Sequence, residues 1–306
     1  MAIANSVVYV TNNSGNSLTV YGGNPSGTLN EAPLATISGT NTGFNQPQGV
    51  ALDAVGKIYV ANDNANSLTV YAGNPSGTLN EVPLGTISGS NTGLNQPADV
   101  ALDAAGKVYV ANNNANTITI YAANPSGTLN EAPLATISGN NTGLNHPDGV
   151  ALDAVGKIYV ANNNAITVYA ANPSGTLNET PLATISGGNT GLNGSVGVAL
   201  DAGAKIYVAN NGGNSVTVYA ANPSGTLNEA PLATITGNNT GLNHPDGVAL
   251  DAGGKIYVAN TQGGMPNVGT VTVYAANPSG TLNETPLATI SGTNTGLNVP
   301  LGVAIH

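Results

Sequence analysis

The sequence contains no cysteine, no tryptophan and a single phenylalanine, and only 7% of its 306 residues are charged. Without cysteine, the chain can form neither a disulfide framework nor a thiolate metal site. The scarcity of charge excludes a coiled coil or a helical bundle, because both need many charged residues at a helical period. Hydrophobic residues make up 41% of the chain, so ordinary disorder, which combines low hydrophobicity with high charge, is excluded as well.

Positive charge is especially scarce. Five lysines and no arginine stand against 15 acidic residues, which gives a formal net charge of −10. A chain with this charge repels phosphate groups, so we expect neither nucleic acid nor an anionic membrane as a partner. No apolar run is long enough to span a bilayer, and residues Met1–Ser6 lack the basic region and apolar core of a signal peptide. The compartment stays open, and a bacterial secreted or cell-surface location is our hypothesis.

What the sequence does contain is a long internal repeat. The segment Asn-Pro-Ser-Gly-Thr-Leu-Asn-Glu occurs six times, and successive copies start 50, 50, 48, 50 and 55 residues apart. Repeats with a period near 50 indicate an array of identical structural units. Because the copies fill the whole chain, we predict a single domain over residues 1–306. The copies begin at Asn24, Asn74, Asn124, Asn172, Asn222 and Asn277.

Each copy contains four short segments that are rich in β-branched and aromatic residues and are bounded by Gly, Asn, Asp or Pro. In the second copy they are residues 49–53, 57–61, 67–71 and 83–88. This pattern predicts β-strands, and no helical period is present. Asp53 closes the first segment before a tight turn that ends at Gly56. Two tyrosines per copy, such as Tyr59 and Tyr71, are predicted to pack between units.

Four-stranded units at this period predict an all-β fold, a β-propeller with four antiparallel strands in each of six blades. The chain starts with a second-type strand, residues 7–11, and ends with a first-type strand, residues 302–306. Pairing of these two strands would complete the first blade, close the ring and remove an open sheet edge. The alternative is a linear solenoid, which would need atypical capping units at both ends, and the sequence has none.

The motifs Gly-Val-Ala-Leu-Asp, Gly-Lys-Ile-Tyr-Val-Ala-Asn and Asn-Ser-Leu-Thr-Val-Tyr resemble those of NHL-repeat propellers over all 306 residues. The spacer between Tyr71 and Pro83 is longer than is usual in that family. The resemblance implies that the first strand lines a central channel, and that the loops leading into each blade share one rim with the second-to-third-strand loops. It also implies a set of channel-lining positions, which are Gln48, Ala98, Asp148, Val196, Asp246 and Leu301.

The six copies differ most in the segment that leads into each blade. Two copies read His-Pro-Asp there, at His146 to Asp148 and at His244 to Asp246, and Asp99 and Asp63 add carboxylates on the same rim. Imidazole and carboxylate groups can ligate Zn²⁺, and the carbonyl oxygens of the Asn-rich second-to-third-strand loops suit Ca²⁺. We therefore name these six residues as candidate ligand-binding residues and the two His-Pro-Asp pairs as candidate metal ligands. In the alternative, structural interpretation, these aspartates stabilise turns.

Three functional hypotheses remain open. The first is a monomeric, non-enzymatic scaffold that binds a protein or small molecule at its rim, because no nucleophile, base and orienting residue stand together in the sequence. The second follows from the family resemblance, which brings hydrolases and lyases of the gluconolactonase type with a divalent ion at the channel mouth. The third is a lectin with repeated sugar pockets, which the absence of tryptophan disfavours. The ligand cannot be read from the sequence.

Overall fold

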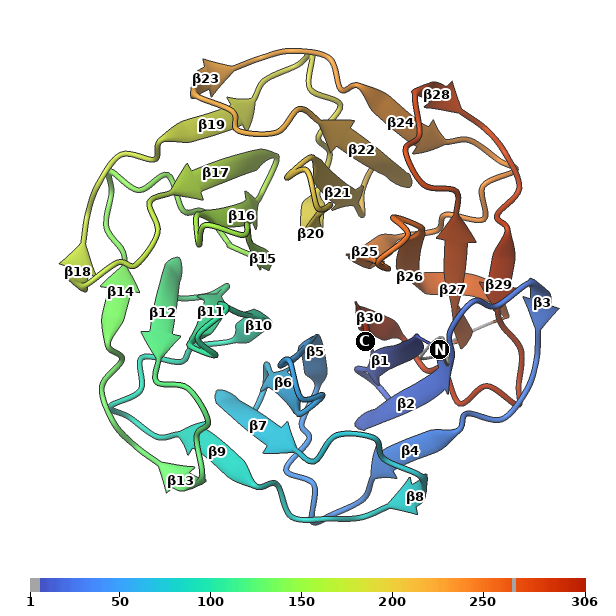
Figure 1. Ribbon diagram of the computed structural model, residues 1–306, viewed down its shortest axis with the longest axis horizontal. Coiled ribbons are helices and arrows are strands. Elements are labelled where there is room, and N and C mark those ends of the chain that lie inside the picture. The colour runs from blue at the N-terminus through green and yellow to red at the C-terminus, as the bar shows by residue number, and fades with distance from the viewer. Residues whose placement is uncertain (1–5, 266–267) are drawn as a thin grey trace.

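The computed structural model describes residues 6–265 and 268–306 as a ring of six small β-sheets around a central channel (Figure 1). The described residues contain no helix, and consequently none that could cross a membrane. Residues 1–5, which make up most of the N-terminal segment considered as a signal peptide, and residues 266 and 267 lie outside the described residues. The sheets are numbered here as blades I to VI in ring order.

Within each blade, four antiparallel strands run from the channel to the periphery, as predicted. The innermost strands are β30 (Pro300–Ile305), β5 (Pro47–Leu52), β10 (Pro97–Leu102), β15 (Gly149–Leu152), β20 (Ser195–Leu200) and β25 (Pro245–Leu250), in blades I to VI. The second strands are β1 (Val7–Asn12), β6 (Ile58–Asn62), β11 (Val108–Asn112), β16 (Ile158–Asn162), β21 (Ile206–Asn210) and β26 (Ile256–Met265).

The next two strands complete the antiparallel part of each blade. The third strands are β2 (Ser17–Gly22), β7 (Ser67–Tyr71), β12 (Thr117–Tyr121), β17 (Ala165–Tyr169), β22 (Ser215–Tyr219) and β27 (Val268–Tyr274). The fourth strands are β4 (Ala35–Ser38), β9 (Gly85–Ser88), β14 (Ala135–Ile137), β19 (Ala183–Ser186), β24 (Ala233–Thr236) and β29 (Ala288–Ile290).

A fifth strand, which the sequence analysis did not predict, lies outside the fourth one and pairs with it in parallel. It is formed by Gly-Thr-Leu of the repeated spacer, and it is contributed by the following copy of the repeat. The long spacer is therefore an exchanged strand that links neighbouring blades. The fifth strands are β8 (Gly77–Leu79), β13 (Gly127–Leu129), β18 (Gly175–Leu177), β23 (Gly225–Leu227), β28 (Gly280–Leu282) and β3 (Gly27–Leu29), in blades I to VI.

Two strand pairings close the ring. The C-terminal strand β30 pairs antiparallel with β1 and completes blade I, which confirms the predicted closure. In addition, β3 from the start of the chain pairs with β29 and becomes the outermost strand of blade VI (Figure 1). The two ends of the chain thus hold the first and last blades together both at the channel and at the periphery.

The hydrophobic core lies between neighbouring blades. In one cluster, Tyr59 and Leu68 of blade II pack against Val108 and Tyr121 of blade III, and all four side chains are buried. The tyrosines on the second and third strands are buried in every blade, so they contribute to packing as predicted. Burial of these apolar side chains is the main force that holds the blades face to face.

The turn after each innermost strand forms as predicted. In blade II, the Oδ1 atom of Asp53 accepts hydrogen bonds from the backbone amides of Val55 at 3.0 Å and Lys57 at 2.8 Å. Gly56 has a φ of +84°, which only glycine adopts without strain. The aspartate at this position therefore stabilises the turn.

Candidate functional site

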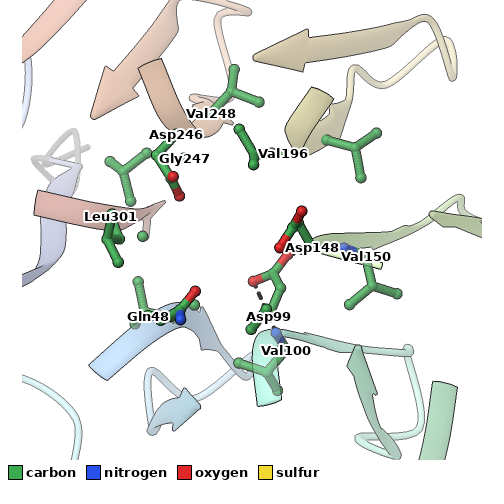
Figure 2. A pocket seen from close by; sticks show the side chains of 17 residues that line it. Gln48, Asp99, Val100, Asp148, Val150, Val196, Asp246, Gly247, Val248 and Leu301 are labelled. Atoms are coloured by element: carbon green, nitrogen blue, oxygen red, sulfur yellow. Dashed lines mark hydrogen bonds between the residues drawn. The ribbon is translucent and has the colours of Figure 1, made fainter. Parts of the chain in front are cut away.

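The candidate site is a cavity of about 130 Å³ in the central channel, lined by the innermost strands of all six blades. The six channel-lining positions implied by the family resemblance all contribute to it. Figure 2 shows Asp148, Val196 and Asp246 among them. In ring order, blades I to VI contribute Leu301, Gln48, Ala98, Asp148, Val196 and Asp246, and Asp99 of blade III adds a third carboxylate. The cavity thus combines three acidic groups, one amide and an apolar wall.

The innermost strands approach one another closely at the residue that follows each of the six lining positions. That residue is glycine in five blades, and a Cβ atom at Gly149 would lie 2.3 Å from the carbonyl oxygen of Val196 in the next blade. The backbones therefore meet where side chains are absent, and the preceding residue of each strand lies at the cavity. This arrangement places Asp148 and Asp246 in the wall of the same cavity.

Asp99 occupies the position that is glycine in the other five blades. Its Oδ1 atom accepts a hydrogen bond from the amide of Val100 at 2.8 Å, and its Oδ2 atom accepts one from Val150 of blade IV at 2.9 Å. These two hydrogen bonds join blade III to blade IV, and the Asp99 carboxylate also borders the cavity. The innermost strand of blade IV, β15, has four residues, whereas β5 and β10 have six.

Asp148 is held by one neighbouring side chain. The Nδ2 atom of Asn113 in blade III donates a hydrogen bond to Oδ1 of Asp148 at 2.5 Å. The Oδ1 atom of the same Asn113 lies 3.2 Å from Nδ1 of His146. His146 is thereby linked to Asp148 through the asparagine and does not contact it directly.

Asp246 differs from the other two carboxylates of the cavity in its hydrogen bonding. It lies deep inside the ring, and the surface it retains faces the cavity (Figure 2). None of the described residues donates a hydrogen bond to its carboxylate. The equivalent of Asn113 is Asn211, but its Oδ1 atom lies 3.1 Å from Nδ1 of His244, and no hydrogen bond joins it to Asp246. Asp246 is therefore a carboxylate with free hydrogen-bonding capacity inside the cavity.

The predicted rim is present, but its histidines are not in the channel. The loops of neighbouring blades meet there, since Oδ1 of Asn116 accepts a hydrogen bond from the amide of His146 at 2.6 Å. His146 and His244 have φ values of +49° and +50°, His146 is exposed, and neither lines the cavity. Asp63 is half-buried and accepts a hydrogen bond from the Gln48 side chain.

Burial and mutual repulsion make the three carboxyls weak acids. Burial raises the pKa of Asp246 to about 7, and the charges of Asp148 and Asp99 raise it further. Burial also raises the pKa of Asp99 to about 7, against the lowering effect of the two backbone amides. For Asp148, burial raises the pKa to about 6, and Asn113 and His146 oppose the rise. The cavity therefore disfavours negative charge and would gain from a positive ligand.

The three carboxylates of the cavity are not close enough together to coordinate one metal ion. Over residues 6–265 and 268–306, no group of three or more His, Asp or Glu side chains has the proximity needed to hold a metal ion. The two His-Pro-Asp segments contribute their aspartates to the cavity and their imidazoles to the rim. Gln48 and the apolar residues complete the polar and apolar lining.

Comparison with protein families gives one match. The family described as "Lactonase, 7-bladed beta-propeller" matches residues 2–144 and, in an overlapping stretch, 58–181. Together these stretches take in more than half of the chain. The chain belongs to this lactonase-type propeller family. It forms six blades, one fewer than the family description states, which the repeat count fixes. The match supports a propeller, and the NHL-type repeat stays a prediction.

Solved structures show the same fold at low sequence identity. A protein of unknown function from Bacteroides caccae is 11% identical with a TM-score of 0.65, and the alignment covers 99% of each chain. A chain of the nidogen/laminin complex is 16% identical with a TM-score of 0.61 and 98% coverage of each chain. A functionally unknown protein from Desulfotomaculum acetoxidans is 16% identical with a TM-score of 0.56, over 90% of this chain and 76% of that one. No curated protein matches the chain.

Proposed function

We propose that this lactonase-type propeller is a non-enzymatic binding module that takes a small ligand into the rim end of its channel. The observation that carries the proposal is the cavity itself, where three carboxylates and one amide face an apolar wall formed by Val196 and Leu301. A concave site with a few convergent polar groups and perturbed pKa values is the usual form of a small-molecule site. An NHL-type arrangement, with variable loops on the same rim, fits this proposal.

The rigid scaffold supports binding without catalysis. The cavity lining offers carboxylate, amide and alkyl groups, and both imidazoles of the His-Pro-Asp segments lie outside it. A general acid and base must both reach the reacting atoms within hydrogen-bond distance. The carboxylates of Asp99 and Asp148 are instead engaged with backbone amides and with Asn113. The proposed role is therefore recognition of a ligand.

A divalent-metal-dependent hydrolase or lyase of the gluconolactonase type is the second candidate. Three carboxylates at one end of the channel and membership of a lactonase family favour it. The wide placement of the acidic groups disfavours it, because a bound ion would have to complete its coordination with water. Turnover of lactones in the presence of Ca²⁺ or Zn²⁺ would establish this candidate and contradict the non-enzymatic proposal.

A thermal-shift screen with a plugged channel tests the binding proposal. The library contains cationic, anionic and neutral small molecules, and hits are repeated on Val196→Phe, which fills the cavity. Val155→Phe is the matched control, because Val155 is 71% exposed on a turn of blade IV. We expect stabilisation of the wild type and of the control and its loss in Val196→Phe. Stabilisation that survives in Val196→Phe would place the ligand elsewhere and overturn the proposal.

A further inference from the structure

We propose that the ligand of this cavity is a small organic cation, a primary alkylammonium ion whose N–H groups bind Asp246 while its alkyl part contacts Val196 and Leu301. This inference rests on the proposed function and adds the chemical class of the ligand. It stands on one unpartnered carboxylate, on the charge of the cavity and on its apolar wall.

The Asp246 carboxylate is the first observation. It lies deep inside the ring and points into the cavity, and none of the described residues donates a hydrogen bond to it (Figure 2). A carboxylate removed from bulk water without a donor costs several kcal/mol, so such groups are found paired or hydrogen-bonded. In the other acidic positions the fold supplies donors, namely two amides for Asp99 and Asn113 for Asp148. At Asp246 the ligand would supply the hydrogen-bond donor.

The charge of the cavity is the second observation. The carboxylates of Asp99, Asp148 and Asp246 repel one another, and no lysine lines the cavity. The other titratable groups near them are Asp63, whose charge adds to the repulsion at Asp148, and His146, which opposes it. A cation in the cavity would relieve this repulsion, whereas an anion would add to it.

The geometry favours an organic cation over a metal ion. Both oxygens of Asp99 are bound to backbone amides, and no three acidic groups of the described residues can share an ion. An ammonium group carries three N–H donors that can reach separate acceptors. Val196 of blade V lies between Asp148 of blade IV and Asp246 of blade VI, and Leu301 of blade I flanks Asp246 on its other side. An alkyl chain attached to the ammonium group would therefore meet apolar surface.

Calorimetric titration with n-butylammonium at pH 8 tests the inference, with n-butanol as the neutral analogue and Ca²⁺ as the metal alternative. We expect saturable binding of n-butylammonium and no binding of n-butanol. The variant Asp246→Asn should weaken n-butylammonium binding about tenfold or more, because it removes a charge-assisted hydrogen bond. Glu131→Gln, at an exposed acidic residue of the spacer that does not line the cavity, is the control and should bind as the wild type does.

A second measurement keeps the test decisive if Asp246→Asn folds poorly. Val196→Phe, which fills the cavity, should abolish binding of n-butylammonium, whereas Val155→Phe, at an exposed residue outside the cavity, should bind as the wild type does. Equal binding of n-butanol, an unchanged affinity in a folded Asp246→Asn, an unchanged affinity in Val196→Phe or binding of Ca²⁺ alone would each overturn the inference. If a neutral or anionic molecule binds the wild type and this binding is lost in Val196→Phe, the inference of a cationic ligand is wrong, whereas the proposed binding function is retained.

Discussion

Among single residues, the contrast between Asp99 and Asp246 shows how one residue type serves either stability or ligand binding. Asp99 accepts hydrogen bonds from two backbone amides and joins two blades. Asp246 has no donor among the described residues and has two carboxylates for neighbours. The sequence cannot separate these roles, because the donors of Asp99 include an amide from the next blade. Sites that bind ligands commonly hold groups that lower the stability of the free protein.

This contrast gives opposite predictions for the same substitution. At pH 8, Asp246→Asn should raise the melting temperature, because it removes a poorly solvated charge that neighbouring carboxylates repel. Asp99→Asn should lower it, because an amide has one acceptor oxygen and leaves one of two backbone N–H groups unpaired, which costs about 1–3 kcal/mol. Calorimetric melting of both variants beside the wild type measures the difference. Equal shifts in the same direction would show that the two carboxyls have similar environments.

Among the elements, the fifth strand is the feature that reasoning from the sequence missed. The four antiparallel strands of each blade were predictable, because each has β-branched residues and turn residues at its ends. The segment Gly-Thr-Leu has only three residues between turn-forming neighbours, and its partner belongs to the preceding blade. Pairing between blades leaves no local pattern, so the spacer could only be recognised as long and invariant. The sequence placed His146 and His244 on the rim together with their aspartates, and the structure separates each pair, because only Asp148 and Asp246 line the cavity.

The exchanged strand should contribute measurably to stability through its leucine. Leu79 of β8 is half-buried and packs on the core between blades I and II, whereas Leu84, just after the end of the spacer, is 50% exposed. We expect Leu79→Ala to lower the free energy of unfolding by about 1–2 kcal/mol and Leu84→Ala to change it by less than about 0.5 kcal/mol. Denaturant unfolding of the two variants makes the comparison. Similar values for both would mean that β8 adds little to the contact between the blades.

In the whole molecule, the closed ring concentrates negative charge in the channel, so its stability should depend on pH. The carboxyls of Asp99, Asp148 and Asp246 have pKa values of about 7, 6 and 7 in the folded chain, against an ordinary value of 3.8. Between about pH 4 and pH 7 the folded state therefore binds more protons than the unfolded state, and these groups make folding less favourable as the pH rises through this window. We expect the melting temperature of the ligand-free protein to fall from pH 5 to pH 8. The melting temperature of the double variant Asp148→Asn with Asp246→Asn should fall less over the same range, and that of Glu131→Gln, at an exposed residue, should follow the wild type. A wild-type melting temperature that rises toward pH 8 would mean that the channel carboxyls are well solvated in the folded ring, and it would remove the electrostatic reason for placing a cation among them.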